Sequence, residues 1–163
     1  MSIDLYRIDD RLIHGQVVVG WGQPMNLGFI VLVDDDVAAS EWEQELYRMG
    51  VPQEMDVYFA SVEDAARRLD GWRAERRHGL LLTGDIETMR RLIERAPGVR
   101  AVNVGGIHHR AGRSQRLRYV FLSPDEERAL RELEARGVTV TAQDVPSAKP
   151  TRLDDLTDGR REA

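Results

Sequence analysis

An arginine, a histidine and two aspartates stand close together near the start of the sequence, directly after a short apolar run. The run is Ile3–Ile8, and Asp9, Asp10, Arg11 and His14 follow it within six residues. A neutral imidazole is a nucleophile near neutral pH, because its ordinary pKa is about 6.5. A guanidinium can hold two oxygens of a phosphate or carboxylate at once. The stretch therefore indicates chemistry on an anion, with His14 as nucleophile or general base and Arg11 as the group that binds the anion.

Gly15, Gln16 and Val17 follow His14 and begin a segment that we expect to be a short helix, Gly15–Trp21. Three successive valines favour a strand, but a crossover between parallel strands is usually helical. Free N–H groups at the start of such a helix would face an anion, and Gly15 would let the backbone come close to it. The spacing leaves one alternative open, in which His14 caps a helix or fills a turn.

Two acidic groups each allow two interpretations. Asp9 and Asp10 could hold Arg11 or fix the tautomer of the imidazole, or they could simply form the turn after the strand. Asp34-Asp35-Asp36 follows a second apolar run and could bind Mg²⁺ through one or two carboxylates. We favour charge at the start of a helix for this run, because successive side chains point in different directions.

Two glycines end a third apolar run, Asn103-Val104-Gly105-Gly106, where backbone N–H groups could approach a phosphate. The run has neither the lysine nor the spacing of a P-loop. His108 and His109 follow, and as adjacent residues they cannot easily bind one metal together. They belong to a surface loop or to the rim of a site, whereas His78 precedes a strand and should lie on the surface at the opposite edge of the sheet.

Short apolar runs alternate with amphipathic segments along the chain, the pattern of an α/β protein with a doubly wound parallel sheet. Several runs are continuously apolar, which is typical of strands covered on both faces. We therefore predict an open, mostly parallel sheet of about six to seven strands with helices on both faces. In such sheets ligands bind beyond the carboxyl ends of the strands. The predicted strands are Ile3–Ile8, Phe29–Val33, Asp56–Ala60, Leu80–Thr83, Ala101–Val104, Leu117–Leu122 and Val138–Ala142.

Capping residues mark the starts of the predicted helices. Ser61 and Asp85 each precede an acidic and apolar-periodic segment, and Ser123-Pro124-Asp125-Glu126 is a capping box with proline at the first helical position. The segment Val37–Met49 should also be helical. From Ser147 the chain is polar without periodicity, so we predict a single domain over residues 1–146 and a loose polar tail over 147–163.

Composition excludes several classes of function. The 163 residues include no cysteine, so disulfides, cysteine-bound zinc and a catalytic thiolate are absent. A formal charge of −5 and a pI near 5.4 argue against nucleic-acid binding. No basic and apolar leader opens the sequence, and the longest apolar runs are far shorter than the roughly 20 residues that span a bilayer. We expect a cytoplasmic protein.

The stretch Arg7-Ile8-Asp9-Asp10-Arg11-Leu12-Ile13-His14-Gly15-Gln16-Val17, with Trp21 behind it, closely resembles the active-site segment of a known family. The family is that of the IIB subunits of the mannose/fructose/sorbose group in the bacterial sugar phosphotransferase system. The resemblance continues through Val33-Asp34-Asp35, Asn103-Val104-Gly105-Gly106, Leu122-Ser123-Pro124-Asp125-Glu126 and Gly137-Val138. It covers nearly the whole chain, in order, to about Val145.

The resemblance implies a phosphocarrier in which His14 accepts a phosphoryl group from a phosphohistidine on a IIA protein. His14 would pass that group to a sugar bound by the membrane subunits IIC and IID, with Arg11 assisting and without a metal or organic cofactor. The protein would then work at the inner face of the cell membrane. Asp9, Asp10, Gly15, Gln16 and Val17 would support the site, and its rim would include Asp35, Gly105, Gly106 and His108.

Two features depart from the family pattern: Asp34-Asp35 adds negative charge where an Asn-Asp or Ser-Asp pair is common, and the loop from His108 to Arg113 is unusually basic. An alternative function is an orphan regulatory module, in which the phosphorylation state of His14 controls a partner instead of sugar uptake. A nucleotide-binding domain ranks last, because no glycine-rich loop follows the first strand. The identity of the sugar and self-association stay open.

Overall fold

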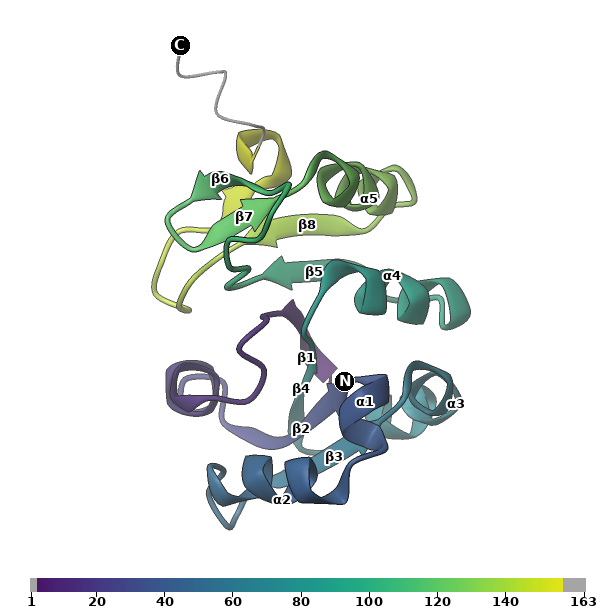
Figure 1. The fold of residues 1–163 in the computed structure, drawn as a ribbon. Coiled ribbons are helices and arrows are strands. Elements are labelled where there is room, and N and C mark those ends of the chain that lie inside the picture. The colour runs from purple at the N-terminus through teal and green to yellow at the C-terminus, as the bar shows by residue number, and fades with distance from the viewer. Residues whose placement is uncertain (1–2, 157–163) are drawn as a thin grey trace.

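A seven-stranded sheet forms the centre of the computed structural model, which describes residues 3–156 apart from the side chain of Gln16 (Figure 1). The strand order is β3-β2-β4-β1-β5-β8-β9, and all neighbouring strands are parallel except β8 and β9, which are antiparallel. β1 lies between β4 and β5, so the loop after it emerges near the middle of the carboxyl edge. The strands are β1 (Ile3–Ile8), β2 (Leu27–Val33), β3 (Asp56–Ala60), β4 (His78–Thr83), β5 (Ala101–Val104), β8 (Thr139–Ala142) and β9 (Thr151–Arg152).

Helices cover both faces of this sheet, as the alternation of apolar and amphipathic segments predicts. On one face α3 (Val62–Arg73), α4 (Ile86–Arg95) and α5 (Pro124–Ala135) bury their apolar sides against the strands. On the other face η1 (Gln16–Trp21), α1 (Asp35–Ala38) and α2 (Glu41–Met49) lie over β2 and β4. No helix within residues 3–156 is long and apolar enough to cross a bilayer.

Six of the seven strands predicted from apolar runs are confirmed, with shifts of at most two residues at their ends. β2 shows why the runs are continuous: Phe29, Val31 and Val33 pack into one core cluster, while Ile30 and Leu32 pack into the other. Successive side chains of a strand point to opposite faces, so a strand covered on both sides has apolar residues at every position.

The crossover after β1 is a short helix, as predicted, but its hydrogen bonding is wider than that of an α-helix. The N–H of Gly22 donates to the carbonyl oxygen of Val17 at 3.0 Å, a bond that spans five residues. Val17 and Val18 are buried among the apolar residues of β2 and β4. Burial of these β-branched side chains therefore outweighs their preference for a strand.

Two predicted elements are wrong in detail. The segment predicted as one helix over Val37–Met49 consists of α1 and α2, because the Ser40 hydroxyl accepts a hydrogen bond from the Glu43 N–H and starts a new helix. The strand predicted over Leu117–Leu122 is instead the turn and second strand of an antiparallel hairpin of β6 (Ser114–Leu117) and β7 (Val120–Leu122), with Leu117 ending β6.

The predicted loose tail over residues 147–163 is wrong for its first part, and the domain boundary at 146 moves with it. β9 pairs antiparallel with β8, and η2 (Leu153–Leu156) follows. Leu153 and Leu156 are buried in the main core cluster, and Arg116 Nη1 donates to the Leu156 carbonyl oxygen at 2.6 Å. Burial of two leucines fixes this polar segment to the sheet. Residues 157–163 lie outside the described part of the chain.

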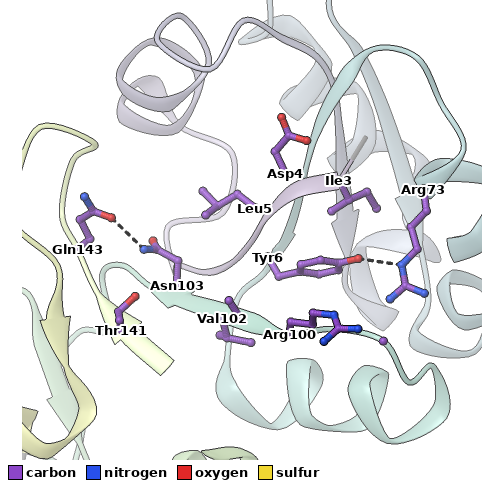
Figure 2. Close-up of a pocket in the computed structure, with 12 residues that line it drawn as sticks. Ile3, Asp4, Leu5, Tyr6, Arg73, Arg100, Val102, Asn103, Thr141 and Gln143 are labelled. Carbon is purple, nitrogen blue, oxygen red and sulfur yellow. Dashed lines mark hydrogen bonds between the residues drawn. The ribbon is translucent and has the colours of Figure 1, made fainter. Parts of the chain in front are cut away.

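β1 and β5 are joined at their carboxyl ends and separate toward their amino ends. Their pairing consists of Arg7 opposite Asn103 and Ile8 opposite Val104. Beyond these pairs the strands diverge and leave a cleft of about 640 Å³, which Figure 2 shows with Asn103 near one end and Arg100 near the other. The paired region between β1 and β5, called here the central seam, is therefore short, and it lies next to the loop that carries His14.

Candidate functional site

His14 lies in the loop between β1 and η1, and a strained backbone orients its ring. Its Nδ1 is 2.8 Å from the carbonyl oxygen of Leu12. A carbonyl oxygen only accepts hydrogen bonds, so Nδ1 carries the ring proton in this arrangement. Leu12 has a φ of 59°, a left-handed conformation that costs a residue with a side chain roughly 1–2 kcal/mol. Gly84 makes room for this residue, because a Cβ at position 84 would lie 2.8 Å from Leu12 Cδ2.

The second ring nitrogen of His14 is shielded. Nε2 is buried, and no hydrogen-bonding group of residues 3–156 reaches it. With Nδ1 bonded to Leu12, neither nitrogen faces an incoming group in this orientation. Either nitrogen therefore becomes accessible only if the ring turns.

Arg11 is held by a buried carboxylate. Asp9 Oδ1 accepts hydrogen bonds from the backbone N–H and the Nε of Arg11, both at 3.1 Å, and Asp9 Oδ2 accepts from Arg11 Nη2 at 3.0 Å. Burial raises the pKa of Asp9, but the hydrogen bonds and charges of its arginine neighbours outweigh burial and hold that pKa below its usual value. The Arg11 side chain keeps 32% of its surface exposed, so it can still reach a ligand.

Arg7 completes this network, a role that was not predicted from the sequence. Although it lies in β1, it is fully buried, and its Nη2 lies 3.3 Å from Asp9 Oδ2. Its guanidinium also lies 4.6 Å from the centre of the Trp21 ring. A lone arginine in an apolar run gives no sign of burial, although the position two residues before Asp9 places both side chains on one face of the strand.

Gly105 and Gly106 give these side chains their space. A Cβ on Gly105 would lie 2.2 Å from Arg7 Nη2 and 2.7 Å from Asp9 Oδ2, and a Cβ on Gly106 would lie 3.2 Å from Arg11 Nε. The structure thus brings both glycines to the predicted site. Their missing side chains make room for the network of two arginines and a carboxylate.

Asp10 is directed to a different partner, the loop after β5. Its Oδ2 accepts from the backbone N–H of His108 at 2.7 Å, and its Oδ1 lies 2.6 Å from His108 Nδ1. Arg113 extends this contact by donating to the His108 carbonyl oxygen and to Glu126 at the start of α5. Of the interpretations for the two aspartates, Asp9 holds Arg11 and Asp10 holds the loop.

The remaining predicted residues have other surroundings. Gly15 is exposed with open space around its Cα, and Val17 is fully buried in the core. Asp35 bonds the N–H of Val62 and the guanidinium of Arg91, and the hydrogen bond from Val62 lowers the pKa of its carboxyl.

Three further polar residues lie close to their predicted places. Asp34 caps α1, which supports helix-start charge over a magnesium site for the aspartate run. His78 is exposed at the amino end of β4, as predicted, with its Nδ1 2.5 Å from Asp4. His109 is exposed, and its ring packs edge-on against Phe121.

Comparison with known proteins agrees with this site. Residues 3–162 match the family model described as "PTS system sorbose subfamily IIB component". The N-acetylgalactosamine-specific phosphotransferase enzyme IIB component 1 of Escherichia coli K12 is 33% identical over 157 residues, which cover 94% of this chain and 98% of that protein. The sorbose-specific EIIB component of Klebsiella pneumoniae is 32% identical over 147 residues, or 90% of each chain. The crystal structure of the IIB domain of the Klebsiella sorbose permease superposes with a TM-score of 0.86 at 31% identity, covering 96% of both chains.

These matches define a class of α/β phosphotransferases that act within the sugar phosphotransferase system. The chain belongs to the sorbose-subfamily IIB components of that system. It is a phosphocarrier, and the family resemblance of its first motif is confirmed.

Proposed function

We propose that His14 is the residue that carries the phosphoryl group, accepting it from a phosphohistidine of a IIA protein and passing it to a sugar bound by IIC and IID. The observation that carries this assignment is the clamp of Asp9 on Arg11, three residues from His14. It holds a cation of fixed orientation beside a nucleophile whose ring proton is placed on Nδ1.

The first transfer begins when the imidazole of His14 turns away from Leu12 and presents an unprotonated nitrogen. That nitrogen attacks phosphorus, and the new N–P bond forms as the N–P bond to the donor histidine breaks. His14 gives up its ring proton and the donor ring takes up one proton, so the donor leaves as a neutral imidazole. Charge spreads over the three equatorial oxygens, and stabilising it is the main task of the surrounding groups. Arg11 supplies two N–H donors and a positive charge for those oxygens.

In the second transfer a sugar hydroxyl attacks the phosphorus. The new O–P bond forms as the N–P bond breaks, and the hydroxyl proton ends on the ring of His14, which returns to the neutral imidazole. The matched relatives carry the names of N-acetylgalactosamine and sorbose systems. We therefore propose a sugar or amino sugar as the final acceptor. The protein would act in the cytoplasm, at the inner face of the membrane while it is docked on IIC and IID.

The test is phosphorylation by the general phosphotransferase proteins together with a panel of IIA proteins. We expect acid-labile, base-stable label on the wild type and none on His14→Ala, with unchanged thermal unfolding. His78→Ala is the matched control, because this exposed histidine lies at the opposite edge of the sheet and its removal should leave labelling intact. Label that persists in His14→Ala would overturn the assignment.

Arg11 is tested in the same assay. Arg11→Ala should retain the fold and lower the rate of transfer by roughly 10²-fold, the effect of removing one preorganised donor from a transition state. A rate equal to that of the wild type would mean that Arg11 has only a structural role.

A further inference from the structure

A fully buried arginine next to the site is not explained by the transfer itself. Arg7 lies on β1 behind Asp9, with no exposed surface, and its side chain therefore cannot touch a phosphoryl group. Burial of a guanidinium is costly unless its charge and its donors are matched. Here several elements supply partners for Nη1 and Nη2, although the buried Nε has no partner in the described part of the chain. This set of partners indicates a specific task for the residue.

We infer that Arg7 is a positioning residue: it holds Asp9 in place and offsets its charge, so that Arg11 is oriented by Asp9 without being neutralised by it. This role rests on the proposed function of His14 and Arg11. It gives a residue of the buried strand β1, and not only the loop after it, a part in the reaction.

Geometry is the first support. Asp9 Oδ2 is shared between Arg7 Nη2 at 3.3 Å and Arg11 Nη2 at 3.0 Å, so the carboxylate lies between two guanidiniums. The other oxygen, Oδ1, accepts only from Arg11 among the hydrogen bonds of the described chain. Without Arg7, Asp9 would lose one of the two partners that determine its position.

The anchoring of Arg7 is the second support. Its Nη1 donates to the side-chain oxygen of Asn103 and to the backbone carbonyl of Gln143 at 2.9 Å, and its Nη2 lies 3.3 Å from the carbonyl oxygen of Asp144. Asn103 is in turn held by Gln143, as Figure 2 shows. Arg7 therefore ties the Asp9 clamp to β5 and to the end of β8, which makes the clamp part of the rigid sheet.

Charge is the third support. Arg7, Asp9 and Arg11 together carry one net positive charge, which favours a phosphoryl group at the exposed guanidinium. If Arg7 is replaced by a neutral residue, Asp9 and Arg11 form a neutral pair. Attraction for the anion then falls, and the buried carboxylate has one counter-charge fewer.

The loss of Arg7 should also change how the transfer rate depends on pH. Asp9 faces the guanidiniums of Arg7 and Arg11. The carboxylate of Asp144 acts on both arginines, and that of Asp10 acts on Arg11. Removing Arg7 takes away one of the charges that oppose burial, so the pKa of Asp9 rises. As pH falls, Asp9 is then protonated earlier and releases Arg11. The rate of transfer should therefore decline at a higher pH in Arg7→Met than in the wild type.

The experiment compares the wild type, Arg7→Met and Arg7→Lys in transfer from a phosphorylated IIA. We expect Arg7→Met to lower kcat by roughly ten- to a hundredfold, with KM for the IIA within about twofold, and to move the acid limb of the pH profile upward. Arg7→Lys keeps the charge but not the planar fork, and should show a smaller loss with little movement of that limb. An unchanged kcat and pH profile in Arg7→Met would overturn the inference.

Arg73→Met is the matched control. Arg73 lies in α3 and donates to the Tyr6 hydroxyl at 3.1 Å, so its loss should affect stability without moving the pH profile (Figure 2). If Arg7→Met fails to fold, Asn103→Ala replaces it, because it removes an acceptor of Arg7 without changing charge. A kcat for Asn103→Ala equal to that of the wild type would count against the inference.

A spectroscopic measurement separates this inference from the proposed function. In ¹⁵N NMR the Arg11 Nε–H should be protected from solvent exchange by its bond to Asp9, and this protection should fall in Arg7→Met. The result is independent of whether His14 accepts a phosphoryl group. Failure to label wild-type His14 would refute the proposed function alone, and unchanged protection in Arg7→Met would refute the positioning role alone.

Discussion

Gly105→Ala tests the close packing of the site most directly. The added Cβ would lie 2.2 Å from Arg7 Nη2, 2.5 Å from Arg7 Cζ and 2.7 Å from Asp9 Oδ2. Arg7 has no free space to move into, because it is fully buried and bonded to several elements. Overpacking of a buried site costs about 1–3 kcal/mol, and a lost hydrogen bond to a charged group costs about 1.5–3 kcal/mol more. We expect a loss of about 3 kcal/mol, or about 6–12 °C in Tm for a domain of this size.

Two other glycines serve as controls for that measurement. Gly106→Ala places its Cβ 3.2 Å from Nε of Arg11, whose side chain is partly exposed and can shift, so we expect less than about 1 kcal/mol of destabilisation but slower transfer. Gly71→Ala in α3 meets nothing within 4 Å and should stabilise the protein by about 0.5–1 kcal/mol. Thermal unfolding of the three variants decides the matter. If the Tm of Gly105→Ala lies within about 2 °C of the wild-type Tm, the close packing of Gly105 against Arg7 and Asp9 is refuted.

Three further predictions concern stability. Leu156→Ala should cost about 2–5 kcal/mol in denaturant unfolding, because Leu156 is fully buried, and no effect would mean that η2 does not belong to the core. Trp42→Ser should change stability by less than about 0.5 kcal/mol, because the Trp42 side chain is 69% exposed. Burial raises the pKa of Glu126, but bonds from Arg113 and Ser123 outweigh burial and hold the pKa of this carboxyl below its usual value. Glu126 thus stabilises the fold above the usual pKa of a glutamate, and the effect is lost as pH falls through the lower pKa of the folded state; Arg113→Met should weaken this acid dependence, measured as Tm against pH.

The sheet could be predicted because its strands are covered on both faces. Continuous apolar runs such as Phe29–Val33 and Leu80–Leu82 alternate with amphipathic segments along this chain. In that setting such runs are most simply strands covered on both faces. The carboxyl-edge rule then placed His14 and Gly105 on the same side of the sheet, and their loops do meet there through Arg7, Asp9 and Arg11.

The errors arose where single residues decide the structure. Arg118 and Tyr119 interrupt the run Leu117–Leu122 and form the turn of a hairpin, but in the sequence they are compatible with a longer strand. Leu153 and Leu156 are too few to produce a visible periodicity, although both are buried.

Helix boundaries and buried ion pairs show two different limits. The pattern Ser40-Glu41-Trp42-Glu43 has the spacing of a capping box and could have indicated the break between α1 and α2. The burial of Arg7 could not have been predicted, because it depends on partners that are 96 or more residues away in the sequence.

The short central seam between β1 and β5 has a mechanical consequence for the site. The two halves of the sheet are paired only at Arg7–Asn103 and Ile8–Val104, and the cleft opens away from these pairs. If the cleft widens, the two halves of the sheet rotate relative to each other about these two residue pairs. Points on a hinge axis move least, so the network of Arg7 and Asp9 lies where relative motion of the two halves is smallest. We therefore expect any opening at the amino edge of the sheet to leave the distances among Arg7, Asp9 and Arg11 nearly unchanged.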